Sequence, residues 1–225
     1  ADALRVDHGQ KYYPGETNLR IADIVVINKV NSLPDANLAQ DQANNIMKIA
    51  KKGCQIVFAN SVVSPVAADE AAKRMLQHGL LEGDKERKYQ WTPDLKALVV
   101  DDGPTLTHGG MSFGAGYVLA ENLGVEVVDI RPYVKGSLCG VFKKYPHLQK
   151  VLPAMGYGKQ QVKDLEDTLK DASVQSKCDC IIVGTPMNLN RVCRLDKPCI
   201  RARYELQVLA NSWPKFESCL KAFIE

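Results

Sequence analysis

The feature of this sequence that most limits its fold is a repeated alternation between two kinds of segment. Short runs of β-branched and other apolar residues have the length and composition of buried strands, and the longer segments between them carry apolar residues three and four positions apart, as amphipathic helices do. Gly, Pro, Asn and Ser residues separate the two kinds. This alternation is typical of βαβ units, so we expect an α/β fold with a mostly parallel sheet flanked by helices, in which ligands bind beyond the carboxyl ends of the strands.

The expected elements follow from the same pattern. Strands are expected over 22–27, 55–59, 97–100, 125–129, 179–183 and 199–204, and helices over about 38–52, 67–78, 113–123 and 159–172. A last helix begins near Ser212 and should bury Phe216, Leu220 and Phe223 on one face. The charged segment 83–90 has the composition of a solvated connection, and we place a division near it. Residues 1–92 are then a nucleotide-base-binding part, and residues 93–225 a C-terminal α/β domain with glycine-rich phosphate and substrate loops.

Composition and charge argue against several classes of protein. The formal net charge is only +3, and acidic and basic residues are interspersed, so no basic arm for nucleic acid and no polybasic membrane patch is expected. The apolar runs are far shorter than the roughly 20 residues of a transmembrane helix, and the first ten residues lack the pattern of a secretion signal. The seven scattered cysteines favour reduced thiols. We therefore expect a cytoplasmic protein.

Two neighbouring strands are followed by residues that could border a nucleotide base. Asn28, Lys29 and Asn31 follow the first strand, as in the N-K-x-D element of GTPase-like proteins, and Ser61 follows the second. In that element an Asp accepts two hydrogen bonds from guanine, which the amide of Asn31 cannot do because it carries a donor. ATP is therefore at least as plausible as GTP. The alternative is that both segments are ordinary turns.

A second candidate site follows the strand at 97–100. Asp101 and Asp102 stand where a carboxylate could coordinate Mg²⁺, and the glycine-rich loop after them includes Gly109 and Gly110. The helix that follows offers its N-terminus to an anion, and His108 could contact phosphate or transfer a proton. The alternative is that the aspartates cap a turn and the glycines only shape a tight connection.

Cations in later loops extend this interpretation. Arg131 and Lys135 follow the strand at 125–129, and Gly158 and Lys159 follow an apolar step at 151–155. Each cation alone is more often solvated, but their recurrence after strands favours a polyanionic ligand. Near the start of the chain, Glu16 follows a Pro-Gly turn and could cap a helix or lie near a metal ion.

Several ordered segments together resemble the C-terminal half of cyclic 2,3-diphosphoglycerate synthetase and its relatives, which include predicted GTPases. They are YYPGETNLRIADIVVINKVN, VVDDGPTLTHGGM, VDIRPYVKGS, LPAMGYGKQQ, IIVGTPMNLNRV and RARYELQ, and they extend from about residue 8 to 207. That family is similar to P-loop NTPases and has its phosphate-binding loop in the N-terminal half. The chain contains no G-x-x-x-x-G-K-[ST] loop and does not begin with Met, so we interpret it as a fragment of a larger chain that lacks its N-terminal half.

The resemblance implies an ATP-dependent ligase-type enzyme with Mg²⁺ as cofactor. A phosphate of 2,3-diphosphoglycerate, or of a related phosphorylated small acid, would be activated and close a cyclic phosphoanhydride with release of ADP and phosphate. Asp101, with Glu16, would hold the metal, and His108, Asp102 and Lys135 would serve catalysis. Two alternatives stay open: a GTPase-like switch or chaperone whose output is partner binding, and a chain that has lost nucleotide binding. A homodimer is also compatible with the sequence.

Overall fold

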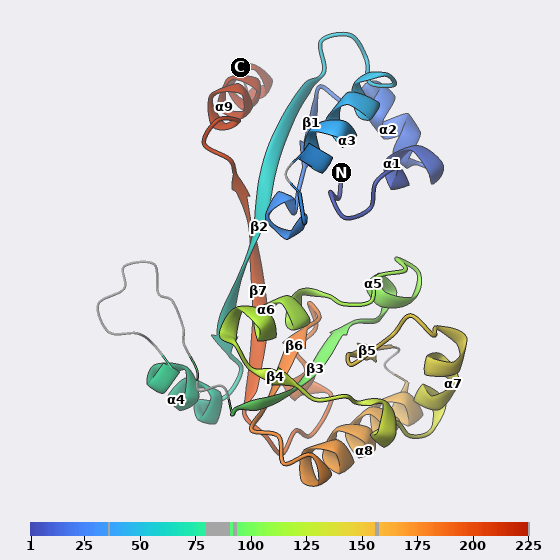
Figure 1. The fold of residues 1–225 in the computed structure, drawn as a ribbon, viewed down its shortest axis with the longest axis vertical. Coiled ribbons are helices and arrows are strands. Elements are labelled where there is room, and N and C mark those ends of the chain that lie inside the picture. The colour runs from blue at the N-terminus through green and yellow to red at the C-terminus, as the bar shows by residue number, and fades with distance from the viewer. Residues whose placement is uncertain (36, 80–90, 92–93, 156–157, 225) are drawn as a thin grey trace. The chain divides into compact units, whose positions relative to one another are not determined.

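The computed structural model describes residues 1–35, 37–79, 91, 94–155 and 158–224 (Figure 1). The chain forms two compact units, one of Ala1–Val62 with Tyr204–Glu225 and the other of Val63–Arg203, which we call unit 1 and unit 2. The division expected between residues 92 and 93, and the expected connection at 83–90, lie outside the described residues. Among the described helices, none is long and apolar enough to cross a membrane.

Unit 1 contains the beginning and the end of the chain. Its elements are α1 His8–Lys11, α2 Gly15–Ile21, β1 Ile24–Ile27, the 3-10 turn η1 Val30–Ser32, α3 Asn37–Met47, the first part of β2 Gln55–Ala67 and α9 Trp213–Ile224. Strands β1 and β2 are parallel, with Ile27 opposite Phe58 at the end of their ladder. Alternate residues of β1, Val25 and Ile27, pack against α3, because successive side chains of a strand point to opposite faces.

Unit 2 is a βα-alternating body. Its elements are α4 Glu70–Gly79, β3 Lys96–Asp102, α5 Gly103–Thr107, α6 Ala115–Leu123, β4 Glu126–Val127, η2 Arg131–Tyr133, α7 Ser137–Lys144, β5 Leu152–Ala154, α8 Lys159–Gln175, β6 Cys180–Gly184, η3 Leu189–Arg191 and the first part of β7 Cys199–Val208. Its core lies on both faces of the sheet: Val99 of β3 joins the cluster that includes α6, while Leu98 and Val100 join the cluster that includes α7 and α8.

The strands follow the order β1-β2-β7-β6-β3-β4, and β5 pairs with β3. Strand β3 is parallel to β4, β5 and β6, and β6 is parallel to β7. Strand β2 runs against β7: in unit 1 Leu209 N donates to Phe58 O, and in unit 2 Ala68 N donates to Cys199 O, at 2.9 Å each. The predicted α/β class is therefore confirmed, with a sheet that is mixed at β2 and β7.

Two elements differ from the expectations because of contacts distant in sequence. Strand β2 continues through the expected turn at Asn60 and Ser61 to Ala67, since pairing with β7 supplies hydrogen bonds that a local turn signal does not reveal. Helix α9 forms where predicted, but the expected burial of its apolar face was wrong. Phe223 is 83% exposed, and no residue of α9 is buried, because in the described residues of unit 1 no second layer covers that face.

Candidate functional site

The 3-10 turn η1 after β1 and strand β2 meet in unit 1 through one side chain. Asn31 donates from Nδ2 to Ser61 O at 3.1 Å and accepts at Oδ1 from Ser61 N at 3.0 Å. Asn31 is exposed and Ser61 is partly exposed. The structure thus brings together two residues that the sequence analysis placed at one base site, and both polar atoms of the Asn31 amide join the turn after β1 to strand β2.

Asn28 and Lys29 shape the same loop. Asn28 Oδ1 accepts from Lys29 N at 2.8 Å, and Lys29 has a φ of 67°, in the left-handed region that non-glycine residues seldom occupy. Lys29 Nζ lies 2.7 Å from Asp2 Oδ2, and its side chain is 33% exposed. The ammonium is therefore held by a carboxylate, while the Lys29 side chain remains partly accessible.

Asp101 is the centre of the strand ends in unit 2. Its carboxylate is fully buried and accepts from Gly114 N at 2.9 Å, Gly116 N at 2.7 Å and Tyr117 N at 3.3 Å. These donors belong to the first turn of α6, which would otherwise leave N–H groups unpaired. The N-terminus of α6, which the sequence analysis offered to an external anion, is therefore occupied by a carboxylate of the chain itself.

Glycines make this arrangement possible. A Cβ at Gly184 would lie 2.0 Å from Asp101 Oδ1, and a Cβ at Gly116 would lie 2.8 Å from the same atom. Gly114 is similarly close to the carboxylate. The glycine-rich loop thus packs around Asp101 with Gly114 and Gly116, while Gly110, with a φ of 65°, turns the chain before them.

Burial dominates the ionisation of Asp101. Removal from water raises the pKa of the Asp101 carboxyl to about 6, although the backbone N–H bonds act in the opposite direction. A carboxylate already saturated with donors is poorly placed to coordinate a cation, and the predicted metal role of Asp101 stays a prediction. Among the described residues no group of three or more His, Cys, Asp or Glu side chains is arranged to hold a metal.

Asp102 and His108 lie at the two ends of the short helix α5. Asp102 Oδ2 accepts from Thr105 N at 3.1 Å and from Thr105 Oγ1 at 2.8 Å, which is a helix N-cap. His108 follows the last turn, is exposed, and has Nδ1 3.1 Å from Thr107 Oγ1. Gly109 N donates to Pro104 O. These two side chains keep accessible atoms beside the buried Asp101, so their predicted catalytic roles stay open.

The predicted cations are paired within unit 2. Arg131 donates to both carboxylate oxygens of Asp129, which lowers the pKa of Asp129, and Lys135 Nζ lies 2.8 Å from Asp171 Oδ2, which lowers the pKa of Asp171. All four side chains are at least one-third exposed. A phosphate would have to compete with these carboxylates.

Two buried polar residues that the sequence analysis missed fix the loop of Lys135. Asp164 Oδ2 accepts from Ser137 N at 2.8 Å and from Ser137 Oγ at 2.6 Å, and Thr168 Oγ1 accepts from Lys135 N at 3.1 Å. Both lie on the buried side of α8. The sequence did offer one signal for this contact: Asp164 is a charged residue next to the apolar stripe of the helix predicted at 159–172.

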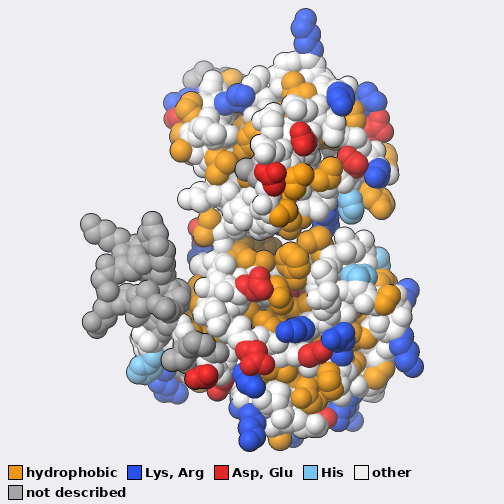
Figure 2. Space-filling view, in the orientation of Figure 1, with side chains coloured by type: hydrophobic (Ala, Val, Ile, Leu, Met, Phe, Trp, Pro, Cys, Tyr) orange, Lys and Arg blue, Asp and Glu red, His pale blue; other side chains and the backbone are white. Residues whose placement is uncertain are grey.

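The remaining predicted residues lie apart from these networks. Gly158 precedes α8 as its N-cap, and Lys159 is exposed in the first turn, while residues 156 and 157 of the same motif lie outside the described ranges. Glu16 pairs with Arg20 on the exposed side of α2. Figure 2 shows charged side chains of both signs interspersed over the visible face of unit 2.

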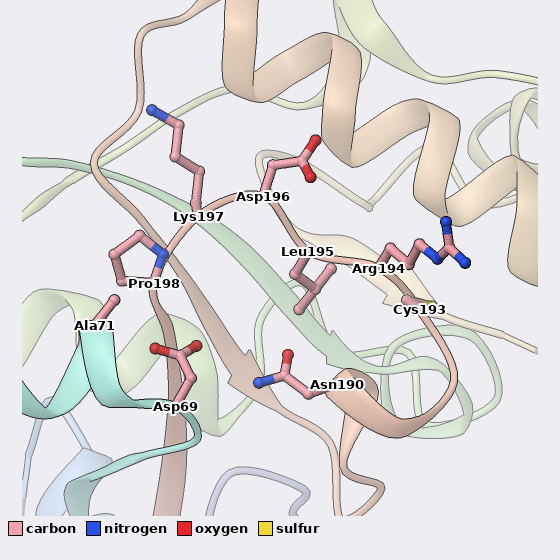
Figure 3. Close-up of a pocket in the computed structure, with 9 residues that line it drawn as sticks. All are labelled: Asp69, Ala71, Asn190, Cys193, Arg194, Leu195, Asp196, Lys197 and Pro198. Carbon is pink, nitrogen blue, oxygen red and sulfur yellow. The ribbon is translucent and has the colours of Figure 1, made fainter.

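A pocket of about 480 Å³ in unit 2 contains none of the predicted residues (Figure 3). It lies beside the segment that leads into β7 and the start of α4, and Asp69 at its rim accepts from Ala72 N and Cys199 N. Because the segment 193–198 enters β7 at its amino end, this pocket is not at the carboxyl end of that strand, where ligands of parallel sheets bind.

No protein-family model matches the chain. The chain is similar to arginine synthetase ArcE of Thermococcus kodakarensis strain KOD1, with 40% identity over 221 residues. The matched region covers 98% of this chain but 43% of the relative, so the chain spans less than half of the length of that curated protein.

Proposed function

We propose that the chain is part of a nucleotide-dependent ligase. The observation that carries this proposal is the 40% identity to a protein named a synthetase across 98% of the chain. Synthetases of this kind join two molecules and consume a nucleoside triphosphate. Because the chain matches 43% of the relative, the proposed activity belongs to a polypeptide that carries these residues together with further sequence.

We propose that unit 1 contributes the subsite for the nucleotide base. Asn28, Lys29, Asn31 and Ser61 lie beyond the β1–β2 ladder, where parallel strands bind ligands. The Asn31–Ser61 hydrogen bonds hold the turn after β1 against strand β2, and the partly exposed side chain of Lys29 carries an apolar stem that could pack on a purine. Since both polar atoms of Asn31 are already bonded, this side chain does not favour guanine, and ATP is the proposed nucleotide.

We propose that unit 2, taken by itself, binds Mg²⁺, phosphate groups and the second substrate. Asp102 is the better metal candidate of the adjacent aspartates, because Asp101 is buried and saturated with N–H donors. His108, Gly109 and Gly110 follow α5, at the opposite end of that helix from Asp102, and His108 and Gly110 are exposed. Further phosphate or substrate contacts are proposed for Arg131, Lys135, Gly158 and Lys159.

The name of the relative makes arginine the first candidate product. Arginine arises from the ureido amino acid citrulline when the ureido oxygen is replaced by nitrogen; transfer of a phosphoryl group from ATP to that oxygen would turn it into a leaving group, so that ammonia could displace it as phosphate. The second candidate is the cyclic phosphoanhydride of 2,3-diphosphoglycerate, favoured by the family resemblance of the sequence segments described above.

Product analysis decides between these candidates. The polypeptide that carries this chain is incubated with Mg²⁺-ATP and either citrulline with ammonium chloride or 2,3-diphosphoglycerate, and products are measured by mass spectrometry and phosphorus NMR. We expect arginine, ADP and phosphate in equal amounts, no reaction with EDTA, and slower turnover with GTP. A cyclic phosphoanhydride would support the second candidate. Nucleotide hydrolysis without either product, or no nucleotide turnover, would contradict the ligase proposal.

A further inference from the structure

A small cavity in unit 1 is lined by polar groups to which none of the proposed roles applies. Its volume is about 30 Å³, and Asp2, Arg5 and Gln42 are among the residues that line it. Gln42 lies on α3 and is only 4% exposed. Its Nε2 donates to Asp2 O at 3.1 Å, whereas its Oε1 is buried without a hydrogen-bond partner among the described residues.

Arg5 lines the same cavity and carries a second buried group that lacks a hydrogen bond. Its Nε is buried and makes no hydrogen bond within the described part of the chain, although it lies 3.5 Å from Asp2 Oδ2 as an ion pair. Arg5, whose Nε–H makes no hydrogen bond within the described residues, and Gln42, whose Oε1 makes none, therefore both line one cavity. Buried polar groups are almost always hydrogen-bonded, so such a pair indicates a ligand.

The size and the chemistry of the cavity select water as the ligand. A buried water needs a space of about 10–15 Å³ and two or more polar partners, and the cavity meets both conditions. A metal cation cannot accept the Arg5 N–H, and an anion would face Gln42 Oε1 and the carboxylate of Asp2. A water molecule can accept a hydrogen bond from Arg5 Nε–H and donate one to Gln42 Oε1.

Asp2 connects this cavity to the proposed base subsite. Its backbone O accepts from Gln42, its Oδ1 accepts from Leu4 N at 3.0 Å, and its Oδ2 lies 2.7 Å from Lys29 Nζ. Displacement of residue 2 would therefore move the partner of the Lys29 ammonium.

We propose that the cavity binds one ordered water that bridges Arg5 Nε and Gln42 Oε1, and that this bridge holds Asp2 as a positioning residue for Lys29. The ordering of Lys29 is independent of nucleotide, but its consequence for ATP rests on the proposed function.

The water is tested by NMR of the arginine Nε–H groups in the chain. We expect a cross-peak between Arg5 Nε–H and a long-lived water, and loss of that cross-peak in Gln42→Met. The matched control is Gln40→Met, the same change on the same helix at an exposed residue whose amide donates to Asn44 Oδ1; it should leave the cross-peak intact. Arg5 Nε–H protons that exchange at the solvent rate in the unchanged chain would overturn the water site.

The positioning role is tested by the Lys29 ammonium and by binding of Mg²⁺-ATP. Asp2→Asn should broaden the Lys29 ammonium signal and weaken Mg²⁺-ATP binding about fivefold, as loss of a partly exposed ion pair does. Gln42→Met should do the same to a smaller extent. The control Asp23→Asn removes the surface pair with Lys51 and should change neither readout.

The outcomes separate the two proposals. If the polypeptide that carries this chain binds no Mg²⁺-ATP, the proposed function fails, and the Lys29 ammonium signal still decides the positioning role. If nucleotide binds but both readouts are unchanged in Asp2→Asn, the positioning role is overturned and the proposed function stands.

Discussion

The strand ends of the two units use polar side chains in opposite ways. In unit 2, Asp101 is a charged group that is fully buried and saturated by backbone N–H groups of α6. In unit 1, Asn31 is a neutral, exposed group that joins the turn after β1 to strand β2. The same sequence signal, a polar residue just after a buried strand, therefore marks an internal anchor in one unit and an accessible brace in the other. Burial and partners decide which of these roles a residue has.

The largest expected effect tests the anchor. Asp101→Ala leaves three N–H groups at the start of α6 without their acceptor, and we expect a loss of about 4 kcal/mol in the free energy of unfolding of unit 2. Urea unfolding is followed by fluorescence in a Trp213→Phe background, where the buried Trp91 of unit 2 is the remaining tryptophan. The neighbouring Asp102→Ala removes one helix cap and should cost about 1 kcal/mol. Equal losses in the two variants would remove the special role of Asp101.

The ionisation of Asp101 gives the next effect. Because its pKa is raised to about 6 in the folded chain, the protonated form favours folding: this contribution is complete below the unfolded pKa of about 4 and is lost as the pH rises through 6. The contribution of Asp101 to the free energy of unfolding therefore changes by about 3 kcal/mol at most over this pH range.

The measurement for this effect is the free energy of unfolding between pH 4 and pH 7, compared between the unchanged chain and Asp101→Asn. The unchanged chain should lose stability relative to Asp101→Asn as the pH rises across this window. Parallel pH profiles of the two proteins would show that Asp101 does not titrate there.

The glycines around the anchor give a smaller effect. Gly184→Ala would place a Cβ 2.0 Å from Asp101 Oδ1, and we expect a cost of about 2 kcal/mol from overpacking. Gly140 of α7 has open space around its Cβ position, so Gly140→Ala should stabilise the chain by up to about 1 kcal/mol through helix propensity. Thermal unfolding of both variants measures this contrast, and destabilisation of equal size would argue against the packing around Asp101.

The smallest effect is expected in the exposed brace of unit 1. Asn31→Ala removes both bonds to the Ser61 backbone and should increase hydrogen exchange at Ser61 N–H by about fivefold, corresponding to about 1 kcal/mol. Asn44→Ala, which removes an exposed contact with Gln40 on α3, is the control and should leave Ser61 protection unchanged. If hydrogen exchange at Ser61 N–H were unchanged in Asn31→Ala, other contacts would hold the turn after β1 against strand β2.

Local sequence signals predict much of the fold and less of the site. The period of apolar residues and the Gly and Pro stops locate most helices and strands, since those signals act within a few residues. The length of β2 and the exposure of α9 depend on what packs against them, which no local pattern contains. The proximity of Asn31 and Ser61 was predictable because both residues follow the ladder of two neighbouring parallel strands, although β2 continues beyond Ser61.

The partners of the site residues were not predictable in the same way. Asp101 accepts from residues 13 to 16 positions later, and Lys135 pairs with Asp171 across 36 positions. Such contacts depend on the tertiary fold. The sequence therefore located charged side chains at strand ends without showing which of them are already satisfied within the chain.

Titration of the isotope-labelled chain with Mg²⁺-ATP, followed by backbone amide NMR shifts, tests the central claim most directly. The account predicts saturable shifts that are largest at Lys29, Asn31 and Ser61 and are reduced with Mg²⁺-GTP. An absence of shifts at these three residues, or saturable shifts confined to the pocket beside Asp69 and Asn190, would contradict a nucleotide-base subsite in unit 1.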